Sequence, residues 1–472
     1  MKRPLSILAL VVAVLAALAS SLPATATPAR SYLIIARGNS LPAGLAADVE
    51  AAGGSITNTI SDIGVAAASS SAADFQSRAA EISGVRSVVP NLVRQWLGPV
   101  SEPVEDANPP SSGDDDARFQ LQWGLDAIDA PEAWNAGYRG AGVRVAVLDS
   151  GIASANPDIA PNLNAALSTS FVPGEAYNFI PTPTTFNHGT HVAGIVAAAD
   201  NTVGTVGVAP SAEIVAVKVL SAATGSGTFE GVVAGIVYAA NIDADVINMS
   251  LGSGPISRRG YLDDMGTPDP SDDVFVTARE VAELVQLVGR ATTYAFQQGT
   301  TIINSAGNEA IDFDHSADII VLPAMAPHVL AISALAPEGW CADPSTNLDL
   351  RASYTNFGRS VIAFGAPGGD FDFPPTFACT VQTAGGPITR PVWVFDGVFS
   401  PGNTAVYFWA SGTSMAAPHV TGVAALIIGK NGGSMSPSQV VSVLRSSADD
   451  LGQPGNDSTY GAGRVNAFNA VR

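Results

Sequence analysis

The amino-acid sequence predicts an α/β fold, with a mostly parallel sheet covered by helices on both faces and a small α+β unit before it. Two patterns carry this prediction. After residue 120, short apolar runs typical of buried parallel strands recur, and helical segments lie between several of them. Before that, residues 31–97 follow the order strand, helix, strands, helix, strand, which is the ferredoxin-like order. A buried parallel sheet needs cover on both faces, so we expect two outer layers of helices.

The first 26 residues have the pattern of a secretory signal. Lys2 and Arg3 form a basic start, residues 5–18 form an apolar run, and residues 24–26 (Ala-Thr-Ala) form a small-residue cleavage motif. A membrane anchor is the alternative, but the run is short for a bilayer span and no later segment is long and apolar enough. We therefore expect an exported, extracellular protein with no membrane span once the signal is removed.

The composition limits the classes of partner. The chain has 472 residues, 47% of them hydrophobic, which is enough for one large core or for two domains with a linker. Its formal net charge is −20. Acidic side chains in excess repel nucleic acid and anionic membrane surfaces, so we expect neither as a main partner.

Residues 31–97 are expected to form the small α+β unit. Gly53-Gly54 ends the first of its helices, because glycine readily adopts the left-handed conformation that follows a helix. The expected elements are a strand at 32–36, a helix at 44–52, one or two strands within 56–68, a helix at 72–82 and a strand at 85–89.

Residues 98–117 differ in composition from the segments on either side. Several prolines are followed by a polar run that ends in three aspartates, at 114–116. Because this stretch has almost nothing to bury, we predict a mobile linker between the small unit and a large domain at 118–472.

The large domain is expected to contain buried parallel strands. The apolar runs lie at 143–148, 214–220, 246–249, 301–303 and 329–332, and helical segments lie at 231–241 and 278–297. In such sheets, functional side chains collect at the carboxyl ends of the strands. Asp149 directly follows the first run, although an isolated aspartate there is often only a helix cap or a turn former.

A serine near the C-terminus has the surroundings of a nucleophile. Ser414 lies between small residues at the expected start of a helix, whose N–H groups and partial positive charge favour a developing oxyanion. The hydroxyl needs a base to take its proton. His188 opens another small-residue helix and could accept that proton through one ring nitrogen while a carboxylate orients the other.

Four motifs together resemble the subtilisin-like serine peptidases, the subtilase family. They are Val-Leu-Asp-Ser-Gly at 147–151, His-Gly-Thr-His-Val-Ala-Gly at 188–194, Ser-Ala-Gly-Asn at 305–308 and Gly-Thr-Ser-Met-Ala-Ala-Pro-His at 412–419. The order Asp, His, Ser is that of subtilisin itself. The resemblance implies a subtilisin-like fold and a serine endopeptidase that acts on proteins or peptides through an acyl-enzyme.

The resemblance assigns a role to each catalytic position. Ser414 would be the nucleophile, His188 the general base and acid, and Asp149 the carboxylate that orients the histidine. Asn308 would donate its amide to the oxyanion, together with the backbone N–H of Ser414. The alternative for Asn308 is a turn former after a strand.

Two further histidines follow catalytic positions within the same helices. His188 and His191 are three residues apart, which also fits a metal pair, but no third ligand is evident nearby. We expect His191 and His419 to be packing or hydrogen-bonded histidines.

The resemblance also points to two segments that would bind the substrate. One is similar to the extended segment along which the family pairs a peptide backbone as an added strand. The other would form the opposite wall of the pocket for the side chain before the scissile bond. The residues are Ser250, Leu251 and Gly252 in the first segment and Ser305, Ala306 and Gly307 in the second.

Calcium is the structural ion that the resemblance implies, and no organic cofactor is expected. Residues 199–205 resemble the family's calcium loop, and Gln120 or Gln122 is a further candidate ligand. Hard oxygen ligands from loops suit calcium, whereas the alternative is a surface turn closed by Gly204. The candidate ligands are Asp158, Ala199, Asn201, Val203 and Thr205.

The unit at 31–97 resembles the family's inhibitory propeptide. A large parallel sheet folds slowly, and a prefolded partner could template it and then block the cleft with its C-terminal strand. We therefore expect an autoprocessed zymogen, cut near Leu97 or near Ala117, and a monomeric mature enzyme. The alternative is an independent binding domain.

Two segments are longer than in compact family members. Residues 253–271 follow the substrate-pairing segment and are expected to form a rim or lid. Residues 369–409 are rich in aromatic side chains and form either a packed β-hairpin or an aromatic wall on the leaving-group side. Cys341 and Cys379 remain two buried thiols or form a disulfide, and in an exported protein we expect the disulfide.

Two alternatives stand beside the broad secreted endopeptidase. One is a processing peptidase with a few dedicated substrates, which the two longer segments would suit. The other is an inactive binding protein on the same fold, although the presence of all four chemical groups favours the enzyme.

Overall fold

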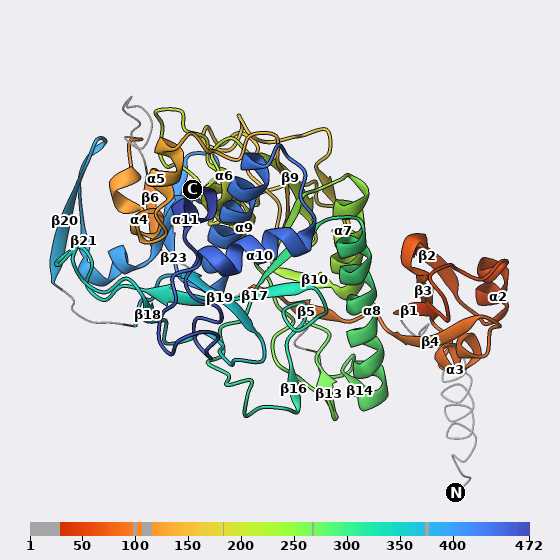
Figure 1. Ribbon diagram of the computed structural model, residues 1–472. Coiled ribbons are helices and arrows are strands. Elements are labelled where there is room, and N and C mark those ends of the chain that lie inside the picture. Colours follow the sequence, from red (N-terminus) through yellow and green to blue (C-terminus); the bar gives the residue numbers. More distant parts are fainter. Residues whose placement is uncertain (1–28, 98–101, 106–115, 183, 267–268, 373–376) are drawn as a thin grey trace, which may run out of the picture.

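The computed structural model describes residues 29–97, 102–105, 116–182, 184–266, 269–372 and 377–472. The expected signal at 1–26 lies outside these residues. Figure 1 shows a small unit, coloured orange-red, beside a much larger α/β domain. Among the described residues, no helix is both long enough and apolar enough to cross a bilayer.

The small unit has the ferredoxin-like topology that the sequence predicts. Its sheet has the strand order β2-β3-β1-β4, and neighbouring strands are antiparallel. Its elements are β1 (Arg30–Ala36), α2 (Leu45–Ala51), β2 (Ser55–Ile60), β3 (Val65–Ser70), α3 (Phe75–Ala80) and β4 (Val85–Pro90), with a 3-10 turn at Ser61–Ile63.

The two faces of this sheet have different partners. Successive side chains of a strand point to opposite faces. Tyr32 and Ile34 of β1 pack with the unit's own helices. Leu33 and Ile35 are buried in a core shared with the large domain, which includes residues of α7 (Phe229–Asn241) and α8 (Ala278–Gln297). The small unit is therefore held by an apolar interface rather than by a tether alone.

The large domain is built on an eight-stranded, mostly parallel sheet, as predicted. The path is β18-β17-β15-β11-β7-β9-β8, and β19 pairs with β17; the β17–β18 pair is antiparallel and the others are parallel. The strands are β7 (Arg144–Asp149), β8 (Thr169–Ser170), β9 (Glu213–Lys218), β11 (Val246–Met249), β15 (Thr301–Ser305), β17 (Val329–Ala336), β18 (Leu350–Arg351) and β19 (Ile362–Pro367).

Helices cover both faces of this sheet. In β7, Val145 and Val147 face a core that includes α6 and α9, whereas Ala146 and Leu148 face α7 and α8. The central strands are thus apolar on both sides, as expected for a parallel sheet between two helical layers. The first layer contains α6 (His188–Ala197) and α9 (Thr413–Lys430), with α4 (Trp123–Ala127), α5 (Ala130–Asn135), α10 (Pro437–Ser447) and α11 (Ala467–Val471).

Several short strands lie outside the main sheet, and two of them come from the segment that leads into the large domain. They are β5 (Val93–Gln95) with β10 (Ser226–Thr228), β6 (Glu102–Glu105) with β23 (Val406–Ala410) and β22 (Val398–Pro401), β12 (Ile256–Ser257) with β16 (Ile319–Ile320), β13 (Gly260–Asp263) with β14 (Val274–Thr277), and β20 (Ala378–Thr383) with β21 (Gly386–Pro391).

The stretch at 98–117 is not a linker throughout. Its residues 102–105 form β6, and Asp116 and Ala117 are buried in the large domain. Composition did not predict these contacts because β6 pairs with a strand about 300 residues away in sequence, and only the folded chain brings the two together.

The C-terminal part of the long segment at 369–409 packs onto the domain. Several of the segment's aromatic side chains, among them Phe399, Tyr407 and Trp409, are almost fully buried together, whereas Phe377 is exposed. Figure 1 shows the hairpin β20–β21 extending from the side of the domain opposite the small unit. The packed β-hairpin is thus the antiparallel pair β22–β23, whose residues are buried, whereas β20–β21 projects from the domain.

Candidate functional site

Asp149 is the last residue of β7 and is buried at the carboxyl edge of the sheet. The parallel register sets Met249 of β11 beside Leu148 and beside Asn304 of β15. The residues that follow these strands therefore meet at one edge. This is the usual location of functional groups in an open parallel sheet.

A buried lysine supports the turn after Asp149. The Nζ of Lys218 donates a hydrogen bond to the backbone carbonyl of Ser150 and pairs with the Glu175 carboxylate at 2.9 Å. Burial lowers the pKa of Lys218, and the hydrogen bond and charge of Glu175 oppose this shift. A fully buried cation needs such partners, so the pair fixes the backbone next to Asp149.

His188 is the first residue of α6 and lies directly against Asp149. Its Nδ1 is 2.9 Å from both carboxylate oxygens of Asp149. The helix begins here because Asn187 caps it, its side chain accepting the Thr190 N–H at 2.8 Å. A proton on Nδ1 donated to the carboxylate leaves Nε2 as the basic nitrogen of the ring.

Ser414 lies in the first turn of α9 and is buried. Its hydroxyl donates a hydrogen bond to the Ser250 carbonyl at 3.2 Å, and the Ser250 hydroxyl donates to the Ser414 carbonyl at 2.7 Å. The N–H groups of a first helical turn have no acceptor within the helix. The serine is thus tied to the end of β11, and its own N–H is available to an oxyanion.

Asn308 lies beside the start of α9. Its Oδ1 accepts hydrogen bonds from both the N–H and the hydroxyl of Thr413, each at 2.9 Å. Because the amide oxygen is held in this way, the NH₂ group of Asn308 is left to donate elsewhere. Gly307 reinforces the contact, since its N–H donates to the Thr413 hydroxyl at 3.1 Å.

The two other histidines of these helices are held as neutral packing residues. His191 is in hydrogen-bond contact with the Phe408 carbonyl at 3.0 Å, and His419 with the Met415 carbonyl at 2.8 Å. Burial lowers the pKa of His191 to about 3 and that of His419 to about 4. No cluster of three or more His, Cys, Asp or Glu side chains that could hold a metal ion occurs in the described part of the chain.

The chain's own residues 93–96 lie along the predicted substrate-binding segment. The N–H of Gly252 donates to the Trp96 carbonyl at 3.1 Å, and β5 forms an antiparallel pair with β10 on the other side. The Trp96 ring packs against Phe229, with ring centroids 5.1 Å apart. Sequence reasoning missed β10, although the Gly-Ser-Gly run at 225–227 after a buried strand was a usable signal.

The second predicted wall lies next to the first. The Ser305 hydroxyl donates to the Leu251 carbonyl at 3.4 Å, and Ser305 and Ala306 are both buried. The segments 250–252 and 305–307 are therefore neighbours at the carboxyl edge of the sheet. Both also contact the start of α9.

The predicted calcium loop closes around Asp158. One oxygen of this carboxylate accepts the Thr205 N–H at 2.8 Å, the Thr205 hydroxyl at 3.1 Å and the Tyr407 hydroxyl at 3.0 Å. Its other oxygen is buried without a hydrogen-bond partner. The Ala199 N–H donates to the backbone carbonyl of Asp158. The Asn201 side chain donates to the Pro157 carbonyl and accepts the Val203 N–H.

Asp116 is a second buried carboxylate at this loop. It accepts the Thr202 N–H at 2.7 Å through one oxygen, and its other oxygen is also buried without a partner. Burial raises the pKa of Asp116 to about 7 and that of Asp158 to about 8. Sequence reasoning missed Asp116, because it lies in an acidic run that offered no signal to distinguish it.

Neither glutamine candidate for this loop has a free amide oxygen. The Gln122 amide donates to the Val206 carbonyl at 2.8 Å and accepts the Val206 N–H at 3.0 Å. Gln120 accepts the Ala384 N–H at 3.3 Å. Among the described residues of this loop and its surroundings, Asp116 and Asp158 each keep one buried carboxylate oxygen without a hydrogen-bond partner.

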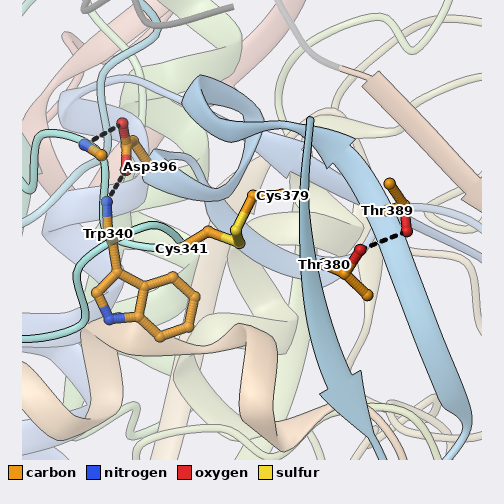
Figure 2. The surroundings of a disulfide bond; sticks show 7 residues. Trp340, Cys341, Cys379, Thr380, Thr389 and Asp396 are labelled. Atoms are coloured by element: carbon orange, nitrogen blue, oxygen red, sulfur yellow. Dashed lines mark hydrogen bonds between the residues drawn. A yellow bond between two sulfur atoms is a disulfide. The ribbon is translucent and has the colours of Figure 1, made fainter. Parts of the chain in front are cut away.

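Cys341 and Cys379 form a disulfide at the base of the β20–β21 hairpin (Figure 2). The loop on the other side is fixed by Asp396, whose carboxylate accepts the backbone N–H groups of Gly339 and Trp340, each at 2.8 Å. At the hairpin's tip, the Gly385 N–H donates to the Ala117 carbonyl at 3.1 Å. The hairpin thus connects the disulfide to the segment that carries Asp116.

Comparison with known proteins agrees with this geometry. Residues 140–463 match the model of the subtilase family (Peptidase S8). The chain is 36% identical to Subtilisin Savinase of Lederbergia lenta over 352 residues, which cover 75% of this chain and 99% of the relative. It is 37% identical to the M-protease of Shouchella clausii (strain KSM-K16) over 352 residues, covering 75% of this chain and 70% of the relative.

Solved structures show the same fold. The epidermin leader peptide processing serine protease (EpiP) from Staphylococcus aureus superposes with a TM-score of 0.71 at 19% identity, covering 94% of this chain and 98% of that chain. A lanthipeptide protease has a TM-score of 0.58 at 25% identity, covering 78% of this chain and 99% of that one. With the Asp149–His188 pair and Ser414 at one sheet edge, these matches lead to a single assignment. The chain belongs to the subtilase family and is a serine-type endopeptidase of the subtilisin-like kind.

Proposed function

We propose that this chain hydrolyses peptide bonds through an acyl-enzyme on Ser414, with His188 as general base and acid and Asp149 as its orienting carboxylate. The observation that carries the proposal is the contact of the His188 Nδ1 with both Asp149 oxygens at 2.9 Å. This contact favours the tautomer in which Nε2 can accept a proton from the serine.

The reaction proceeds in two steps, acylation of Ser414 and hydrolysis of the acyl-enzyme. The Ser414 oxygen attacks the peptide carbonyl while its proton passes to the His188 Nε2, and the tetrahedral intermediate then expels the amine, which takes this proton. A water molecule next attacks the acyl-enzyme, giving a proton to His188. Collapse of the second intermediate releases the acid and returns the proton to the Ser414 oxygen.

Asn308 and the Ser414 backbone are proposed as the donors to the tetrahedral oxygen. Thr413 occupies the amide oxygen of Asn308, which supports donation from the NH₂ group toward the substrate. A donor held in place before the reaction costs no reorganisation when negative charge develops, and this is the source of its catalytic effect.

A fluorophosphonate probe tests the assignment. The matured protein is expected to be labelled at Ser414, as located by mass spectrometry, and the Ser414→Ala chain is expected to remain unlabelled. Absence of labelling in protein freed of its N-terminal unit would reject the enzyme in favour of the inactive binding protein.

We further propose that the unit at 31–97 is a propeptide that helps the domain to fold and blocks its cleft until it is cut off. The antiparallel β5–β10 pair and the Trp96–Gly252 hydrogen bond support this, since residues 93–96 run where a substrate backbone would pair. The burial of Asp116 and Ala117 in the large domain favours processing near Leu97 over processing near Ala117.

The site of processing can be read from the mature N-terminus. The wild-type chain is expected to yield a product that retains Asp116, whereas the Ser414→Ala chain is expected to stay full length. A mature enzyme that begins after Ala117 would contradict this assignment.

We propose calcium as a structural ion at the loop 199–205. The unpartnered buried oxygens of Asp158 and Asp116 fit a hard cation, and the loop can add oxygens from Ala199, Asn201, Val203 and Thr205. Bound there, the ion would neutralise two buried carboxylates. It takes no part in the chemical step.

We also propose export, with residues 1–26 as the cleaved signal. Fractionation of a producing cell, with the protein found outside only when these residues are present, tests this. The monomeric state expected for the mature enzyme is tested by light scattering.

A further inference from the structure

Arg94, in the middle of β5, is bound by residues of the long segment that follows the substrate-pairing strand. Its Nη1 is 2.9 Å from the Asp263 carboxylate. Its Nε and Nη2 donate to the Ser253 carbonyl at 3.1 and 3.0 Å. The guanidinium carbon lies 5.4 Å from the ring centroid of Tyr261. The side chain thus has an anion, a carbonyl and an aromatic face as partners.

The backbone that presents Arg94 is held as an added strand. Arg94 is opposite Gly227 in the antiparallel register of β5 with β10, and Trp96 contacts Gly252 on the other side. Ser253 directly follows Gly252. A peptide that paired with the same two edges would set the side chain at this register position before the same three groups.

The Asp263 carboxylate, which faces Arg94, is buried and is held by its own chain segment. The side chain of Asp263 is completely buried, whereas that of Arg94 remains 20% exposed. The second oxygen of Asp263 accepts the Met265 N–H at 2.9 Å, which fixes the carboxylate at the end of β13. One oxygen of Asp263 is therefore held by the large domain itself, and the other one faces the residue opposite Gly227.

The burial of Asp263 determines which side chains the position opposite Gly227 accepts. A desolvated carboxylate is strongly unfavourable without a cation, and leaving it unpaired costs more than the pair contributes. Arginine matches the site best, because its planar group can bond the carboxylate and the carbonyl together and stack on the tyrosine. A neutral side chain would leave Asp263 unpaired, and an acidic one would add repulsion.

We propose that Asp263, Ser253 and Tyr261 form a specificity subsite for a basic side chain in the substrate, on the N-terminal side of the cleaved bond. The inference rests on the proposed peptidase function and deepens it. Arg94 occupies the subsite while the N-terminal unit is attached. After processing, the same groups select peptides with arginine, or less well lysine, at the position opposite Gly227.

Quenched fluorescent peptides that retain residues 91–105 test the subsite, with Arg, Lys, Gln or Glu at position 94. For the mature wild-type enzyme, kcat/KM is expected to fall in that order, by about tenfold to a hundredfold from Arg to Gln. Equal cleavage of the Arg and Gln peptides would overturn the proposal and reduce the Arg94–Asp263 pair to a contact of the N-terminal unit.

Two variants of Asp263 test whether its carboxylate causes the preference for arginine. Asp263→Asn keeps the acceptor for Met265 and is expected to cut the Arg and Gln peptides equally, while Asp263→Arg is expected to prefer the Glu peptide. Asp264→Asn is the matched control, because Asp264 is the exposed neighbour and accepts the Gly266 N–H at 3.0 Å. It is expected to keep the wild-type order.

The outcomes separate the two proposals. An Asp263→Asn enzyme that retains the preference for arginine would overturn the subsite while leaving the peptidase function intact. If no peptide is cut and the fluorophosphonate labels no serine, the peptidase function itself fails. Should the Asp263 variants not mature, the wild-type enzyme with the four peptides still decides.

Discussion

The Tyr407 hydroxyl donates a hydrogen bond to the buried Asp158 carboxylate at 3.0 Å. Tyr407 belongs to β23, which ends at Ala410, shortly before Ser414. Asp158 anchors the loop that resembles a calcium site. The hydrogen bond therefore joins this loop to the strand that leads into the nucleophile's helix. A change in the charge of the loop should for this reason change the stability of the domain.

Calcium is expected to stabilise the protein through Asp158 and Asp116. In the full chain carrying Ser414→Ala, which cannot digest itself, adding calcium should raise Tm and a chelator should lower it. At a hundred times the Kd the gain is about 2.7 kcal/mol. Asp116→Asn should weaken the calcium-dependent gain, whereas Asp343→Asn, at an exposed turn, should not. A Tm independent of calcium would contradict the assignment.

Asn308→Asp should lower kcat by about a hundredfold to a thousandfold and leave KM nearly unchanged. The new carboxylate still accepts the two hydrogen bonds from Thr413, but it cannot donate to the oxyanion and places a negative charge near it. Steady-state kinetics on a peptide substrate measure the split. Asn456→Asp, at an exposed loop, is the control. An increase in KM alone would show that Asn308 acts only in binding.

Stability should fall in acid because His191 and His419 are held neutral. Their pKa values are lowered by burial to about 3 and about 4, against 6.5 for the free side chain. As pH falls below 6.5, the unfolded chain binds protons that the folded chain does not. The free energy of unfolding should then decrease by about 1.4 kcal/mol per pH unit for each histidine.

The variant His419→Gln should reduce the slope of the free energy of unfolding against pH by the contribution of about one proton. Urea unfolding from pH 6.5 to 4.5 in the Ser414→Ala background measures this slope. His315→Gln is the control. The pKa of exposed His315 is raised by Asp312, so its contribution is lost only as pH rises above 6.5. An unchanged acid slope in His419→Gln would refute the assignment of that proton to His419.

Breaking the disulfide should lower stability by at most about 4 kcal/mol, the entropic effect expected for two cysteines separated by 38 positions in the sequence. The variant with serine at both positions should have a lowered Tm that a thiol reductant no longer affects. The wild-type protein should shift to the same Tm when reduced. Equal Tm values with and without reductant in the wild-type protein would mean that the bridge carries no stability.

Part of the site was predictable because its residues carry local signals. Asp149 follows an apolar strand, and His188 and Ser414 each open a helix of small residues. These patterns arise from the chemistry of a few neighbouring residues. The contacts of Asp116, Lys218 and Asp263 left no such signal, since a buried charge is recognised only by what surrounds it.

The sequence by itself determined the α/β class, the small N-terminal unit and the separate motifs, because apolar periodicity and helix starts are local properties. Only the tertiary structure decided which segments meet. It seats residues 93–96 between β10 and Gly252, and it pairs Arg94 with Asp263 across 169 residues of sequence. Such contacts depend on the register of distant strands and on burial, and these are fixed only when the whole core has packed.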